Sequence, residues 1–200
     1  MAVSRIKTSS VLQGFPKSRS LLAGNPPFTP SSFESIATAT GSGATTITFS
    51  SIPQTYKHLQ VRYMARANTG AGILGAVELT FNGVTGTSYA SHRLWGNSST
   101  ANAAGAASQA SIQNVTIAGG GILANTYGVG IIDIQDYSST TRNKTVRTLI
   151  GLDQNTGSTS SQILMLSGLF NSTSAITSMT FTLAAGFDST TVYSLYGIQG

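Results

Sequence analysis

A serine beside a histidine, as at Ser91 and His92, could supply a nucleophile and the base that activates it. The pair lies in the segment YASHRLW, whose alternating pattern predicts a β-strand. Neighbouring residues of a strand point to opposite faces, so these two side chains would not meet. We therefore expect His92 to be a surface histidine or a hydrogen-bonded core histidine.

Two aspartates, Asp133 and Asp136, could act as an acid–base pair if their carboxylates met. They are three residues apart on the predicted strand GVGIIDIQDY, which places them on opposite faces. We predict one structural aspartate and one at the strand end. A calcium site is the alternative, but it requires six to eight converging oxygens.

Other motifs that could support chemistry are missing from the sequence. There is no cysteine, and neither histidine has the HxxxH or HExxH spacing of zinc ligands. The Gly119–Gly121 run is not followed by the Lys-Ser/Thr pair of a phosphate loop, so it predicts a turn. With six carboxylates and two histidines in 200 residues, we predict a non-enzymatic protein without metal or cofactor.

Trp95, together with the tyrosines, is the candidate binding site inside the domain. Aromatic rings can stack on sugars, so these residues could form a platform for a host surface glycan. The alternative is that they belong to the core or to cross-strand pairs.

The elements that would position these residues are short strands separated by Gly, Ser and Asn turns. HLQVRYMAR places Leu59, Val61 and Tyr63 on one face, and AVELTFNG ends in the tight-turn pair Asn82-Gly83. About eleven such strands predict an all-β fold, an antiparallel β-sandwich or jelly roll. The alanine-rich stretch 98–110 predicts a flexible loop, with a short helix as the alternative.

Proline and charge mark a separate N-terminal segment. All five prolines lie in the first 53 residues, and NPPFTP at 25–30 predicts an extended connector. We predict an extended arm at 1–30 and a β-sandwich domain at 31–200. The arm carries four of the eleven Lys and Arg residues, which leaves seven basic and six acidic residues, a charge of +1, in the domain. A clustered basic face for nucleic acid is therefore not expected, nor is an apolar run long enough to insert into a membrane.

Four stretches resemble a known family: SSFESIATATGSGATTITFSSIPQTYKHLQVRYMARAN, YASHRLWGN, IIDIQDYSSTTRNKTVRTLIG and VYSLYGIQG. In this order they resemble β-rich modules of structural proteins in tailed-phage virions, especially of phages that infect marine and cyanobacterial hosts. The opening SRIKTSSVLQGFPKSRSLLAGN is similar to a leader of such proteins. The resemblance implies a non-enzymatic protein at the surface of a virion, in contact with other virion structural proteins.

From this we infer that the arm is a docking strap and the sandwich is the displayed body. We also expect a homo-oligomer, because a surface with few charges costs little to desolvate. A disordered tail and a mitochondrial targeting peptide are the alternatives for the arm. The residues expected to dock are the cations and the apolar side chains of the arm: Arg5, Ile6, Lys7, Val11, Leu12, Phe15, Lys17, Arg19, Leu21 and Leu22.

Two placements on the particle follow from the resemblance. One is a tail fibre or similar appendage, which we slightly favour because such sandwich modules recur in fibre-like proteins. The other is a capsid decoration, or cement, protein that stabilises the head. A carbohydrate-binding module centred on Trp95 is the more distant alternative.

Overall fold

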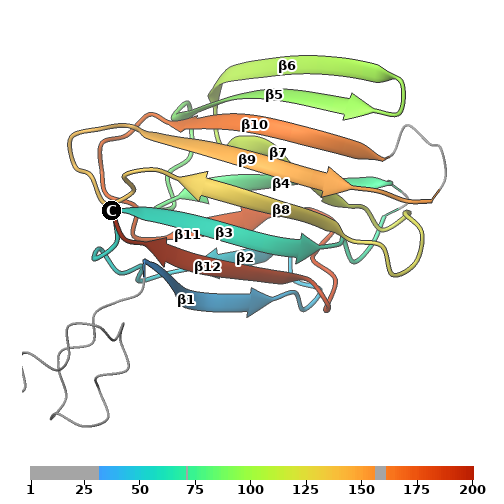
Figure 1. The fold of residues 1–200 in the computed structure, drawn as a ribbon, viewed down its shortest axis with the longest axis horizontal. Helices are drawn as coiled ribbons and strands as arrows, with labels where there is room; N and C mark the ends of the chain where they lie inside the picture. Colours follow the sequence, from blue (N-terminus) through green and yellow to red (C-terminus); the bar gives the residue numbers. More distant parts are fainter. Residues whose placement is uncertain (1–31, 71, 156–160) are drawn as a thin grey trace, which may run out of the picture. The chain divides into compact units, whose positions relative to one another are not determined.

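The computed structural model describes residues 32–70, 72–155 and 161–200, which form two antiparallel sheets. Figure 1 looks onto the larger sheet, with the smaller sheet behind it. The larger sheet has the strand order β1-β12-β3-β8-β9-β10-β5-β6, and the smaller has the order β2-β11-β4-β7. The predicted β-sandwich is therefore confirmed.

The large sheet consists of β1 (Phe33–Thr40), β3 (His58–Ala65), β5 (Tyr89–Asn97), β6 (Thr100–Gln109), β8 (Gly128–Ile134), β9 (Lys144–Leu152), β10 (Gln162–Phe170) and β12 (Val192–Ile198). The small sheet consists of β2 (Thr46–Phe49), β4 (Leu74–Phe81), β7 (Ile112–Ala118) and β11 (Met179–Thr182).

The chain alternates between the two sheets, apart from two hairpins that widen the large one. With β5-β6 and β9-β10 set aside, the remaining strands have the orders β1-β12-β3-β8 and β2-β11-β4-β7. The jelly-roll form of the sandwich stays a prediction.

Period-two alternation places the core between the sheets, as the sequence predicts. Leu59, Val61 and Tyr63 of β3 are buried, and so are Val146 and Ile150 of β9. Their side chains face the small sheet because successive strand residues point to opposite faces.

Aromatic rings join the two sheets through Tyr193 of β12. Its ring stacks on Tyr63 at 5.0 Å between centroids and lies 4.7 Å from Phe181 of β11. The Tyr63 hydroxyl donates to the Thr116 carbonyl of β7 at 2.9 Å, whereas the Tyr193 hydroxyl is buried without a hydrogen-bond partner. Burial raises the pKa of Tyr193 far above its usual range.

The two stacked tyrosines should therefore respond in opposite directions to loss of the hydroxyl. Tyr193→Phe removes an unsatisfied buried group and should raise the free energy of unfolding by about 1 kcal/mol. Tyr63→Phe leaves the Thr116 carbonyl unpaired and should lower it by about 1–2 kcal/mol. Urea denaturation of both variants measures the two changes, and a shift of equal sign would contradict this account of the core.

The predicted loop at 98–110 was wrong, because the residues from Thr100 to Gln109 form strand β6. The prediction was based on the lack of a large apolar residue to bury. At a sheet edge none is needed, since main-chain pairing with β5 holds the strand and most of its side chains stay exposed.

Strand β10 carries apolar residues on both of its faces. Leu164, Leu166 and Phe170 point into the core, while Ile163 and Met165 are exposed on the other side of the sheet. The large sheet thus has a second apolar face.

Candidate functional site

The outer face of the large sheet exposes large apolar side chains on five neighbouring strands. Their exposed fractions range from 37% for Ile131 to 62% for Ile163. Single exposed apolar residues are ordinary, but a contiguous group marks an interaction surface. The group consists of Met64, Val129, Ile131, Leu149, Ile163, Met165 and Leu94.

Strand register arranges this face in rows that run across the strands. In the first, which we call the glycine row, Val129 of β8 lies opposite Gly151 of β9, and Gly151 lies opposite Ile163 of β10. Large and small residues therefore alternate along most of the row. From β3 to β6, the glycine row is Met64, Val129, Gly151, Ile163, Gly96 and Ala101.

The next row, which we call the leucine row, lies two residues further along each strand. Long side chains fill it except at its β6 end, where Ala103 lies. Its centre is Leu149 of β9 against Met165 of β10. Arg62 marks its β3 end, where the guanidinium lies over the rings of Phe33 and Tyr196. The leucine row is Arg62, Ile131, Leu149, Met165, Leu94 and Ala103.

Three depressions lie beside the glycine row and the leucine row. One of about 440 Å³ and another of about 690 Å³ share Val129, Gly151 and Ile163 in their linings. A third, of about 490 Å³, lies beside Leu94 and Met165. The face is therefore notched next to its most exposed side chains.

A third row, which we call the polar row, borders the apolar ones. Asp133 of β8 pairs with Arg147 of β9 at 2.7 Å and accepts a hydrogen bond from the Gln60 side chain at 2.8 Å. This ion pair is neutral as a unit, so the row adds little net charge. The polar row is Gln60, Asp133, Arg147, Ser167, His92 and Gly105.

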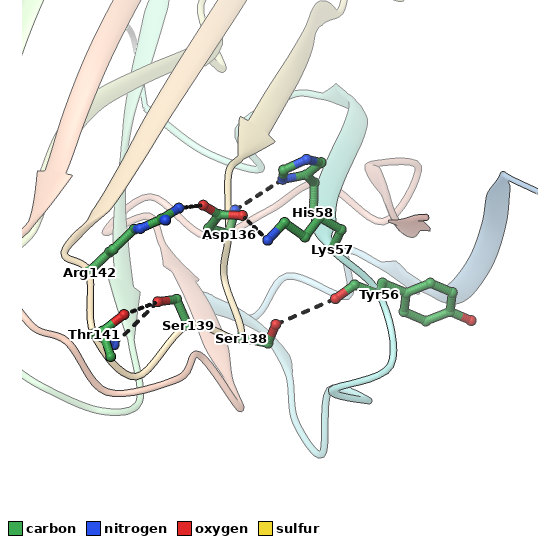
Figure 2. A network of polar contacts seen from close by, with 8 residues as sticks. All are labelled: Tyr56, Lys57, His58, Asp136, Ser138, Ser139, Thr141 and Arg142. Atoms are coloured by element: carbon green, nitrogen blue, oxygen red, sulfur yellow. Dashed lines mark hydrogen bonds and ion pairs between the residues drawn. The ribbon is translucent and has the colours of Figure 1, made fainter. Parts of the chain in front are cut away.

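A separate polar cluster surrounds Asp136, in the loop after β8 (Figure 2). Its carboxylate pairs with Lys57 at 2.9 Å and with Arg142 at 2.6 Å, and its backbone N–H donates to Nδ1 of His58 at 3.0 Å. The Lys57 hydrogen bond, followed by that of Arg142, holds the pKa of Asp136 below its usual value against the opposing effect of desolvation. These contacts fix the β8–β9 loop next to the start of β3.

The structure confirms that Ser91 and His92 lie on opposite faces of their strand, and that Asp133 and Asp136 do not form a pair. Ser91 is buried and faces the core, whereas His92 is exposed on the outer face. Asp133 is on β8 and pairs with Arg147, whereas Asp136 lies beyond the end of β8 and pairs with Lys57 and Arg142. No three His, Cys, Asp or Glu side chains gather as metal ligands within the ranges that the structure describes.

Trp95 is half-buried on β5 and packs against the core cluster. The Arg93 guanidinium lies over its ring, 4.5 Å from the centroid. The tyrosines Tyr63, Tyr89 and Tyr193 are buried in the core. A sugar would meet Trp95 beside a cation rather than beside these tyrosines, and glycan binding at Trp95 stays a prediction.

The predicted docking residues of the arm, from Arg5 to Leu22, lie outside the described residues. Nothing helical in the described part of the chain has the length and hydropathy needed to cross a membrane. Comparisons with protein-family models, with curated proteins and with solved structures found no match.

The outer face was missed by sequence reasoning, although its signal is present. Ile131, Leu149 and Met165 each alternate with an equally apolar residue that faces the core, so the strands read as continuous apolar runs. Such runs are typical of strands covered on both faces. The small sheet covers one face of β8, β9 and β10, and the chain's own described residues leave the other open.

Proposed function

We propose that this chain is a non-enzymatic structural protein of a tailed-phage particle. It acts by contact with other protein subunits, through its sandwich and its N-terminal arm. The sequence resemblance is the reason for assigning the chain to a phage particle. The apolar outer face of the large sheet is the reason for proposing that it acts by protein–protein contact.

The observation that carries the proposal is the apolar outer face. Seven large apolar side chains lie in two adjacent rows across five strands. Exposing them to water costs free energy that burial against a protein surface recovers, at about 25 cal/mol per Å². The cost of desolvating charges on this face is reduced because Asp133 and Arg147 neutralise each other.

The arm supplies the second contact. Residues 1–30 contain four cations and no acid, together with apolar side chains such as Phe15 and Leu21. Such a segment suits an acidic, partly apolar groove of a neighbouring virion protein. An appendage of the tail is the favoured placement, and decoration of the capsid is the alternative.

Deletion of residues 1–25 tests this function on particles. The truncated chain should fold but join particles at no more than about a tenth of the wild-type occupancy, because one contact worth about 1.4 kcal/mol already changes binding tenfold. Occupancy is measured by quantitative mass spectrometry of purified particles. A C-terminal label imaged on intact particles gives the placement, on the head or at the tail vertex. Full occupancy of the truncated chain would reject the arm's role, and absence of the wild-type chain from particles would reject the function.

A further inference from the structure

We propose that the outer face of the large sheet binds the same face of a second copy of this chain, forming a two-fold dimer of sheets packed face to face. This inference rests on the proposed function, because it names one partner of an assembly protein. It is carried by the order of large and small residues in the glycine row.

The glycine row is complementary to itself. Consider a two-fold axis that lies between the two faces, runs along the strands and passes midway between β9 and β10. It brings β9 opposite β10 of the second copy, β8 opposite β5, and β3 opposite β6. Ile163 then faces Gly151 of the second copy, and Val129 faces Gly96. Each large side chain meets a residue without one.

The other rows agree with the same axis. In the leucine row, Leu149 faces Met165 of the second copy, and Arg62 faces Ala103 rather than another cation. In the polar row, Asp133 faces His92 of the second copy. No like charges oppose each other in this arrangement, which is what a specific interface requires.

The geometry and the area suit a dimer. Packed sheets cross at about −30° and lie about 10 Å apart, so the pairs nearest the axis, Ile163 with Gly151 and Leu149 with Met165, match best. The axis brings six strands of each copy into contact, β3 to β6, and a spacing of about 4.8 Å with a rise of about 3.4 Å per residue gives these a face of about 800 Å². A standard interface buries about 800 Å² on each partner.

Charge argues against the arm as the occupant of this face. Residues 1–30 bring four cations. The three rows contain one carboxylate, that of Asp133, which already pairs with Arg147. A second copy brings no such excess of charge, so it fits the face better than the arm does.

Two variants change the fit without disturbing the subunit. A Cβ added at Gly151 would meet its nearest atom, Cγ2 of Val129, at 3.9 Å, an ordinary contact, so a side chain can start here without a clash and Gly151→Leu would fill the depression beside it. Ile163 is mostly exposed, and Ile163→Ala removes the side chain that enters the depression. By symmetry, each change acts twice in a homodimer.

Sedimentation velocity of the full-length chain tests the dimer. The wild-type chain should dimerise with a Kd in the micromolar range or below, because interfaces that bury about 1,600 Å² in total range from micromolar to picomolar affinity. Gly151→Leu should raise that Kd by about 100-fold or more through overpacking, and Ile163→Ala by about 10-fold or more through two cavities. Circular dichroism checks that both variants stay folded.

Mixing the two variants gives the decisive measurement. In the mixed dimer one contact is native, and in the other the enlarged residue 151 meets the shortened residue 163. The mixed pair should therefore bind at least about 10-fold more tightly than either variant binds itself. Native mass spectrometry with one variant isotopically labelled counts mixed and unmixed dimers.

The outcomes separate this inference from the proposed function. A wild-type chain that stays monomeric at about 100 μM, well above the Kd expected of such an area, overturns the dimer even if the chain joins particles. Loss of particle incorporation by both variants without rescue on mixing also overturns it, in favour of a different protein on this face. A dimer with the mixing pattern, formed by a chain absent from particles, supports the dimer and rejects the particle function.

Discussion

Lys144→Met should lower the free energy of unfolding by at least about 3 kcal/mol, the largest loss expected from removal of one charge. Lys144 begins β9 and is fully buried. Its ammonium donates to the carbonyls of Ser139 at 2.6 Å, Thr173 at 2.7 Å and Ser174 at 2.6 Å. The side chain thus joins the β8–β9 loop to the β10–β11 connection.

Two effects of this substitution oppose each other. In the folded protein, desolvation by burial disfavours the charged ammonium and lowers the pKa of Lys144. Replacing Lys144 by Met removes this cost. The three carbonyls remain, however, and each hydrogen bond that they lose to the charged ammonium is worth about 1.5–3 kcal/mol. The second effect is larger because only one side of the contact is replaced.

Lys57→Met is the matched control. The Lys57 side chain is about half exposed and pairs with Asp136, which keeps its contact with Arg142. A surface pair of this kind contributes about 0–1 kcal/mol. Guanidinium denaturation compares the two variants with the wild type. Equal, small changes in both would show that the carbonyl cage of Lys144 does not hold the two loops.

The strands could be predicted because their signals are local. The inward alternation of Val146, Thr148 and Ile150 is what the pattern of β9 predicts. The Asn82-Gly83 turn likewise has the positive φ angles, 53° and 66°, that this pair favours in tight hairpins. Each signal lies within about ten residues, so no knowledge of distant partners is needed.

The features that were missed depend on pairings between distant segments. β6 is a strand because β5 lies beside it, and its Ala, Asn and Gly residues carry no strand signal of their own. Lys144 resembles an ordinary polar residue at a strand start, yet two of its three carbonyl partners, at Thr173 and Ser174, are 29 and 30 residues away. The depression at Gly151 exists because strand register places Val129 and Ile163 on either side of a residue without a side chain.

Contact between distant segments also gives the second large expected effect, a loss of stability in Gly41→Ala. Gly41 follows β1 in the stretch ATGSGATT, which predicts only a turn. In the fold its N–H donates to the Thr191 carbonyl at 2.8 Å. A Cβ at this position would lie 1.9 Å from the Asp188 carbonyl oxygen and 3.1 Å from that of Phe187. The β1–β2 and β11–β12 connections therefore approach closely enough to exclude any side chain.

Because the obstructing atoms belong to the backbone, no side-chain rotation relieves the clash, and one of the two connections must move. We expect Gly41→Ala to cost about 3 kcal/mol, at the upper end for overpacking. Amide exchange should increase at Gly41, whose N–H donates to the Thr191 carbonyl, and at Thr191, whose N–H donates to the Asp188 carbonyl that the new Cβ would displace. Ser42→Ala, at the exposed neighbouring residue, should change stability by less than about 0.5 kcal/mol. Chemical denaturation and hydrogen exchange measure both variants. Unchanged stability of Gly41→Ala would mean that the two connections are further apart than described, and that the sandwich closes at this end by other contacts.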